Sequence, residues 1–250
     1  MILKDLHTHT TYCDGRDTPR DMVEAALALG MDTLGFSGHS YTFFDERYCM
    51  SKKGTELYKN EVAALKEEYK GRLNILLGIE LDAYSEQSVE GFDYVIGSVH
   101  YVKVGGEYLP VDEAARFEGV CRDHFGGDYL AFAEEYYRTV RTLADKKIDI
   151  IGHIDVITKF NEGGRLFDEN DPRYIEASRG AVDALLPLGI PFEVNTGAIA
   201  RGYRTEPYPS ASLADYILQK GGKLVLSSDS HSTENLCYQF DKWDARTKGL

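Results

Sequence analysis

The chain has 250 residues, of which 43% are hydrophobic and 28% are charged, and its formal net charge is -13. This composition is typical of a soluble globular protein, without an apolar stretch that could span a bilayer and without a cationic, hydrophobic leader at Met1. The acidic excess disfavours nucleic acid as a partner and favours a small substrate. The four cysteines form no CxxC pair, so neither a zinc ribbon nor a disulfide framework is indicated. We expect one cytoplasmic domain over residues 1–250, with reduced cysteines and no membrane partner.

Strand-like runs alternate with helical segments along the chain. The apolar runs predict seven strands, at residues 2–8, 33–38, 73–81, 93–102, 148–154, 190–196 and 223–228. Apolar residues at helical spacing predict helices between them, at residues 19–29, 55–69, 128–146, 172–188 and 210–221. Alternation of this kind indicates an α/β fold with a parallel sheet and helical crossovers, and barrels of this class often have this length. No internal repeat or interdomain linker interrupts the pattern.

Three longer segments interrupt the alternation, at residues 40–54, 103–127 and 197–209. The first two are rich in aromatic and polar residues, and the third carries two arginines. Each follows a predicted strand, so we expect all three to lie over the carboxyl end of the sheet, as active-site loops do in barrels of parallel strands. We expect these loops to select the substrate.

Six of the seven histidines stand at, or just past, the end of a predicted strand. His7 and His9 are two residues apart on a strand, so both side chains point to the same face. Glu80 occupies the corresponding place on another strand, and two aspartates lie close to strand ends. The candidate metal ligands are His7, His9, Asp14, His39, Glu80, His100, His153, Asp229 and His231. Nine nitrogen and oxygen ligands without a thiolate suit two or three divalent ions such as Zn, Mn or Fe.

Each candidate also has an ordinary structural interpretation. A single histidine near a strand end is more often a core or capping residue than a ligand. Asp14 and Gly15 form a turn dipeptide, while Glu80 and Asp229 are suited to helix capping or a salt bridge. The joint pattern favours a metal centre, because six histidines would otherwise reach equivalent strand ends by chance. The seventh, His124, is predicted in a loop and is not included.

The motifs at these strand ends resemble those of the PHP (polymerase and histidinol phosphatase) family. They are DLHTHT, GHS ending at Ser40, GIELD around Glu80, GSVH ending at His100, GHID around His153 and SSDSH ending at His231. The loop order and the NTGAIARG segment resemble the monofunctional histidinol-phosphate phosphatases of that family. The resemblance implies a distorted (β/α)7 TIM-like barrel with its metal site at the C-terminal ends of the strands, in agreement with the seven predicted strands.

The resemblance also implies how the ligands divide among the ions. It assigns His7, His9, Glu80 and Asp229 to the first ion, Glu80, His100 and His153 to the second, and Asp14, His39 and His231 to the third. The implied reaction is hydrolysis of L-histidinol phosphate to L-histidinol and phosphate, a late step in histidine biosynthesis, by in-line attack of a metal-bridging hydroxide. Glu80, Asp229 and His231 are the expected catalytic residues, with Asp229 or His231 as the general acid.

Four further residues are candidates for binding the substrate. Arg201 and Arg204 are suited to a bidentate contact with the phosphate, and Lys159 adds a point charge. Asn195 ends the sixth predicted strand, where it is suited to orienting a ligand, contacting the substrate or capping a turn. For the imidazole and the amine, location alone suggests Tyr41, Asp45, Glu46 and Tyr108.

The main alternative is a PHP phosphoesterase that acts on a nucleotide, a phosphopeptide or a sugar phosphate. A nuclease would need a basic track, which the acidic composition does not indicate. A non-catalytic, metal-stabilised scaffold would be expected to lack ligands, whereas all nine positions hold a competent residue. Relatives usually continue past the DSH segment with a helix, a Gly-containing turn and a short strand-like segment, whereas this chain ends at DKWDARTKGL. The shorter end puts the closing helix and the stability in question, but no metal ligand. The sequence leaves a homo-oligomer open.

Overall fold

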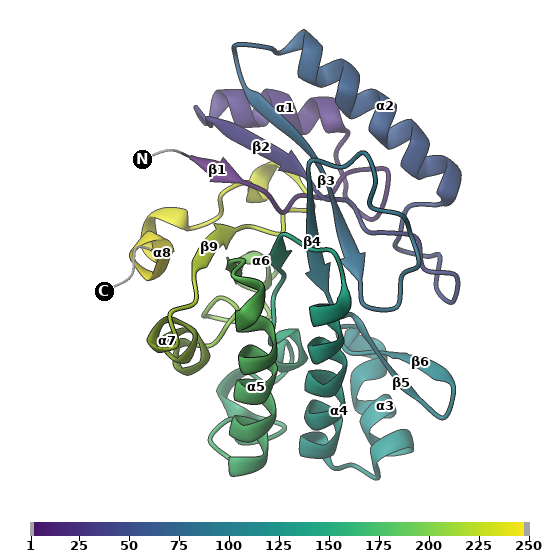
Figure 1. Ribbon diagram of the computed structural model, residues 1–250, viewed down its shortest axis with the longest axis vertical. Helices are drawn as coiled ribbons and strands as arrows, with labels where there is room; N and C mark the ends of the chain where they lie inside the picture. Colours follow the sequence, from purple (N-terminus) through teal and green to yellow (C-terminus); the bar gives the residue numbers. More distant parts are fainter. Residues whose placement is uncertain (1–2, 248–250) are drawn as a thin grey trace.

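A computed structural model describes residues 3–247 and is shown in Figure 1. Its main sheet has seven strands, each parallel to its neighbours, in the order β1-β2-β3-β4-β7-β8-β9. Their bounds are β1 Lys4–Asp5, β2 Thr33–Phe36, β3 Asn74–Asp82, β4 Tyr94–Ser98, β7 Ile150–Ile151, β8 Phe192–Asn195 and β9 Leu224–Ser227. The predicted parallel α/β sheet of seven strands is therefore confirmed.

Three predicted strands differ clearly from the observed ones. The fifth, at 148–154, is reduced to Ile150–Ile151. The first, at 2–8, is reduced to Lys4–Asp5, and residue 2 lies outside the described residues. The fourth, at 93–102, is divided after Ser98, because the backbone N–H of His100 donates to Asp82 instead of continuing the ladder. Beyond this break, β5 (Tyr101–Val104) pairs antiparallel with β6 (Glu107–Pro110) in a separate hairpin.

The edges of the sheet meet beyond the ends of β1 and β9. Thr8 and Ser230 form a parallel bridge, in which Ser230 N donates to His7 O at 3.1 Å and His9 N donates to Ser230 O at 2.8 Å. Just before this bridge, the buried carboxylate of Asp5 accepts hydrogen bonds from Ser228. The sheet is thereby nearly closed into a distorted barrel, and the closing contacts lie next to His7 and His9.

The predicted helices are observed with altered ends. They are α1 Pro19–Ala28, α2 Lys52–Glu68, α4 Tyr129–Arg141, α5 Pro172–Leu185 and α7 Ala211–Gln219. Single turns of 3-10 helix follow or connect these elements, at η1 Thr142–Asp145, η2 Val156–Thr158, η3 Glu162–Gly164, η4 Leu186–Leu188 and η5 Thr233–Asn235. Local signals explain the starts: Thr18 and Asp21 form a capping box before α1, with Pro19 at its first position.

Three helices lie where no helix was predicted. The insertion at 103–127 contains α3 (Ala114–Phe125), so His124 lies in a helix and the prediction of a loop there was wrong. Phe117, Val120 and Cys121 supply the buried helical face that the prediction overlooked. The other two are α6 (Gly197–Ala200) and a closing helix, α8 (Phe240–Thr247), which contacts β8 and β9. Within residues 3–247, no helix is long and apolar enough to cross a membrane.

A small apolar cluster lies beneath the carboxyl end of the barrel. It consists of Leu6, Tyr94, Ile96 and Ile150, and the Tyr94 hydroxyl donates to Leu6 O and Phe36 O. A Cβ at Gly35 or Gly78 would lie within 2.4 Å of the Tyr94 side chain, so glycine is required where this ring crosses β2 and β3. The cluster gives the side chains above it a rigid, dry floor. That residues 1–250 form one domain stays a prediction.

Candidate metal centre

The nine predicted ligands converge above this floor, at the carboxyl end of the barrel. The structure places them in four overlapping groups whose ligand atoms lie within 4.8 Å of one another. The groups are His9, Asp14, His39 and His231; His7, His153 and Asp229; His7, His9 and Glu80; and His39, Glu80 and His100. Every predicted ligand therefore belongs to at least one group. They meet because the carboxyl ends of parallel strands share one edge of the sheet.

Glu80 lies between two sets of histidines. Its Oε1 is 3.0 Å from Nε2 of His153 and 3.3 Å from Nε2 of His100. Its Oε2 is 2.9 Å from Nδ1 of His39, 3.2 Å from Nε2 of His7 and 3.5 Å from Nε2 of His9. The two carboxylate oxygens thus face different imidazole nitrogens, which is the arrangement needed for a carboxylate that bridges two cations.

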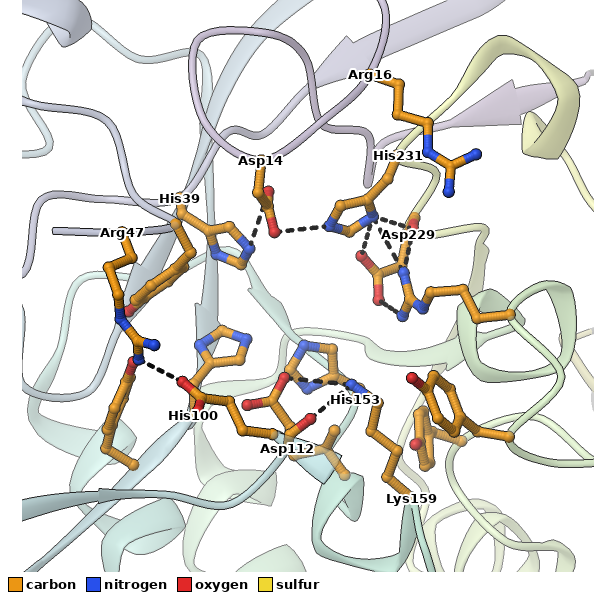
Figure 2. Close-up of a pocket in the computed structure, with 17 residues that line it drawn as sticks. Asp14, Arg16, His39, Arg47, His100, Asp112, His153, Lys159, Asp229 and His231 are labelled. Atoms are coloured by element: carbon orange, nitrogen blue, oxygen red, sulfur yellow. Dashed lines mark hydrogen bonds and ion pairs between the residues drawn. The ribbon is translucent and has the colours of Figure 1, made fainter. Parts of the chain in front are cut away.

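Asp14 and Asp229 extend the cluster on the solvent side. Asp14 lies 3.6 Å from Nε2 of His39 and 3.3 Å from Nε2 of His231, as Figure 2 shows. The Oδ1 atom of Asp229 is 3.2 Å from Nε2 of His9. The ligands expected for the third ion were Asp14, His39 and His231, and in the structure His9 lies in the same group.

The unpaired atoms of the cluster fit divalent cations. In the described chain, Nε2 of His7, Nε2 of His9 and Oε2 of Glu80 are buried and make no hydrogen bond. Orphaned buried polar atoms cost free energy, and native proteins rarely leave three of them facing one another. Imidazole nitrogen with carboxylate oxygen is the donor set used for ions such as Zn, Mn and Fe. The residues present therefore fit the predicted metal ions.

Electrostatics keep the carboxylates of the cluster ionised. Burial alone would raise the pKa of Glu80, but His7, His39 and His100 hold this pKa well below its usual range. Burial, together with His231 and His39, lowers the pKa of His9 to about 3, so this imidazole is neutral and able to bind a metal. Carboxylates around His7 raise its pKa despite burial, so metal binding at His7 would release a proton.

Two carboxylates that the sequence analysis missed hold the histidines in place. Glu193 Oε1 lies 2.7 Å from Nδ1 of His7, and Glu193 Oε2 accepts the backbone N–H of His153 at 3.0 Å. Asp82 Oδ2 lies 3.3 Å from Nδ1 of His100. Carboxylates in this position orient a metal-binding imidazole and raise its basicity. A signal was present, since Glu193 is an acid between two apolar residues of strand β8, Phe192 and Val194.

Replacement of Glu193 by glutamine should weaken metal binding by about 10- to 100-fold. Glutamine keeps the size of the side chain but removes the negative charge next to His7 Nδ1. The measurement is a titration of metal-free protein with Zn²⁺ against a competing chelator. The matched control is Glu176→Gln on the exposed face of α5, which should bind as the unaltered chain does. Equal affinity in Glu193→Gln and the control would show that Glu193 does not support the centre.

A cavity of about 450 Å³ opens above the metal-ligand cluster. Six of the predicted ligands line its wall, Asp14, His39, His100, His153, Asp229 and His231, and all six are labelled in Figure 2. The other lining residues are Arg16, Arg47, Tyr48, Tyr101, Asp112, Glu113, Val156, Lys159, Arg201, Tyr203 and Tyr208. All three insertions contribute to this list, so their predicted place over the carboxyl end is confirmed.

The residues suggested by location for the imidazole and amine do not line this cavity. Tyr41 instead donates its hydroxyl hydrogen to Glu46 at 2.8 Å. Asp45 accepts from Arg47 at 2.8 Å, and Tyr108 belongs to an aromatic cluster around Phe44. Neighbours in the same insertions reach the cavity in their place, because the hairpin and its flanking loops turn these four side chains away.

The predicted substrate-binding residues separate into two groups. Arg201 and Lys159 line the cavity. Arg204 does not, because its buried guanidinium donates to Thr158 O at 3.0 Å. Asn195 is also buried, where its Oδ1 accepts from Gly197 N and its Nδ2 donates to Glu193. Of the roles considered for Asn195, it therefore caps the turn and orients the carboxylate that holds His7.

The fold and the site together define a class: a nearly closed barrel of parallel strands with a histidine and carboxylate metal centre at its carboxyl end. The family model described as PHP domain matches residues 5–197, and the chain belongs to this family.

Similar proteins agree with this assignment. The chain is 33% identical over 253 residues to a probable histidinol-phosphatase of Deinococcus radiodurans, with 95% of this chain and 90% of that protein covered. It is 28% identical to the histidinol-phosphatase of Bacillus subtilis, with 96% and 98% covered. Its fold matches the crystal structure of histidinol phosphate phosphatase from Lactococcus lactis, complexed with Zn, L-histidinol and phosphate, with a TM-score of 0.74, 20% identity, and 99% and 93% covered.

Proposed function

We propose that the protein is a metal-dependent phosphomonoesterase that hydrolyses L-histidinol phosphate to L-histidinol and phosphate. The observation that carries this proposal is the position of Glu80 between two sets of histidines, next to a cavity of about 450 Å³ that His39, His100 and His153 line. A cavity of this volume suits a small molecule. The names of the relatives from Deinococcus radiodurans and Bacillus subtilis support the choice of substrate.

The ligands would divide among three ions as the family resemblance implies, with Glu80 a ligand of both the first and the second ion. By that resemblance, His7, His9 and Asp229 would complete the first, His100 and His153 the second, and Asp14, His39 and His231 would form the third. When bound, two or three divalent ions supply positive charge for the phosphoryl oxygens and generate a nucleophile from water at neutral pH. The chain's own residues fix the positions at which this chemistry can occur.

Asp229 and His231 differ in what each can do with a proton. Burial alone would raise the pKa of Asp229, but Arg201 and His7 hold that pKa well below its usual range. An ionised Asp229 can accept the proton that the attacking water loses and then donate it to the leaving alkoxide, whereas His231 would hold the third ion, so we assign this proton transfer to Asp229. The ion pair at 2.9 Å between Arg201 and Asp229 positions the aspartate against His7 and His9.

The walls of the cavity suit the organic half of L-histidinol phosphate. Asp112 and Glu113 place carboxylates beside the metal-ligand cluster, where they can accept hydrogen bonds from an ammonium group. Tyr48, Tyr101 and Tyr203 supply aromatic faces for an imidazole ring.

The proposal predicts a preference of at least about 100-fold in kcat/KM for L-histidinol phosphate over a nucleoside monophosphate and p-nitrophenyl phosphate. Phosphate release is measured on protein of known metal content, and a chelator should abolish it until metal is restored. Equal rates on the three esters would retain the metal-dependent hydrolysis but remove the assigned substrate. Fully metallated protein that releases no phosphate from any ester would contradict the proposed function and favour a scaffold.

A further inference from the structure

Four cationic side chains line the cavity, and three of them are already paired with carboxylates. Arg47, Lys159 and Arg201 each have an acidic partner within ion-pair distance, so much of their charge is neutralised before any substrate arrives. The pairs are Arg47 with Asp45 and Glu113, both at 2.5 Å, Lys159 with Asp112 at 3.4 Å, and Arg201 with Asp229 at 2.9 Å. The fourth cation is Arg16.

Arg16 differs from the other three in having a free guanidinium. Among residues 3–247, no carboxylate lies within ion-pair distance of it and no hydrogen bond from its side chain is present. The side chain is exposed to solvent at the rim of the cavity. A guanidinium offers several N–H donors in a planar fork that matches the oxygens of a phosphate group.

The backbone around Arg16 is rigid, although its side chain is free. Arg16 N donates to His231 O at 2.8 Å, and Gly15 N donates to Thr10 O at 3.1 Å. A Cβ on Gly15 would lie 2.4 Å from Thr10 N, so the turn is packed against the preceding backbone. The same turn supplies Asp14 to the group formed with His9, His39 and His231. An anion at that group would therefore lie beside the base of the Arg16 side chain.

Figure 2 shows Arg16 beside His231, with Asp112 and Lys159 on the other side of the cavity. The cavity thus has an unpaired cation at one side and, at the other, the ion pair of Lys159 with Asp112, whose carboxylate also lines the cavity. This separation matches a substrate with a phosphate at one end and an ammonium group at the other.

We propose that Arg16 is the residue that binds the phosphoryl group, through hydrogen bonds from its guanidinium to the non-bridging oxygens. The inference rests on the proposed function and adds to it the residue that captures the anionic end of the ester. Arg201, which the sequence suggested for this role, keeps Asp229 in place. Arg16 is an unpaired donor near the metal ligands, so its contact with phosphate displaces no internal ion pair.

The experiment measures binding of inorganic phosphate by calorimetry to metal-loaded protein, and KM and kcat for L-histidinol phosphate. Arg16→Gln should weaken phosphate binding about tenfold and raise KM by a similar factor, with metal content unchanged. Arg16→Lys should recover part of the loss, because it restores the charge but not the bidentate geometry. The matched control is Arg122→Gln, an exposed arginine paired with Asp123 outside the cavity.

Equal phosphate affinity in Arg16→Gln and the unaltered chain would overturn the inference. A parallel loss of metal from Arg16→Gln would overturn it as well, because the effect would then act through Asp14. The calorimetric readout does not depend on turnover. If the unaltered protein hydrolyses none of the esters, the proposed function fails, while the phosphate affinities still decide the role of Arg16.

Discussion

Replacement of Glu80 by glutamine should reduce kcat/KM for L-histidinol phosphate by at least about 10³-fold and lower the metal content of the purified protein. An amide cannot present two anionic oxygens, so one of the two sets of histidines around Glu80 would lose its shared ligand. Glu80 is only 1% exposed, and no neighbouring water can readily replace the lost oxygen. Phosphate release and metal analysis of the same preparations provide the test.

The matched control for this prediction is Glu90→Gln, which changes an exposed glutamate on the loop after β3. It should retain both metal and activity. If Glu80→Gln also retained its metal content and its rate of phosphate release, the bridging role would be refuted. The ligands would then have to be assigned to the ions in another way. Loss of activity with full metal content would indicate that Glu80 acts in the reaction without holding the ions.

Replacement of Asp5 by alanine should lower the free energy of unfolding by about 3–5 kcal/mol. The Asp5 carboxylate accepts hydrogen bonds from His7 N at 3.3 Å, from Ser228 N at 3.1 Å and from Cys237 N at 3.1 Å, and also from the Ser228 hydroxyl. It is fully buried where the first and last strands meet. Alanine would leave several buried donors without an acceptor and loosen the closure of the barrel.

Denaturant unfolding should be measured on metal-free protein, so that altered metal binding at His7 does not contribute to the difference. Lys4→Ala is the matched control, because Lys4 lies on the same strand and is exposed; its effect should stay within about 0.5 kcal/mol. Asp5→Asn should fall between the two, since an amide retains one acceptor. Identical stability of Asp5→Ala and the control would show that closure does not depend on this carboxylate.

Most of the ligand set could be predicted because the histidines, Glu80 and Asp229 stand at, or just past, recognisable strand ends, whereas Asp14 lies in a turn beyond β1. The rule that carboxyl ends of parallel strands share one edge then brings His7, Glu80 and His153 together without further information. The carboxylates that hold the histidines in place were harder to predict from the sequence. Glu193 and Asp82 act only through contacts with histidines distant in sequence, and nothing in their local pattern identifies those partners. The division of the ligands among ions stays a prediction.

The sequence alone determined the alternation of strands and helices and the histidines at the strand ends, because periodicity and strand termination are short-range properties. Only the tertiary structure decided which charges around the cavity are paired. Lys159 meets Asp112 and Arg201 meets Asp229 because loops far apart in sequence pack over the same barrel end. The same packing leaves Arg16 unpaired among the described residues. Ion pairs of this kind depend on distances between segments, and a sequence pattern does not contain those distances.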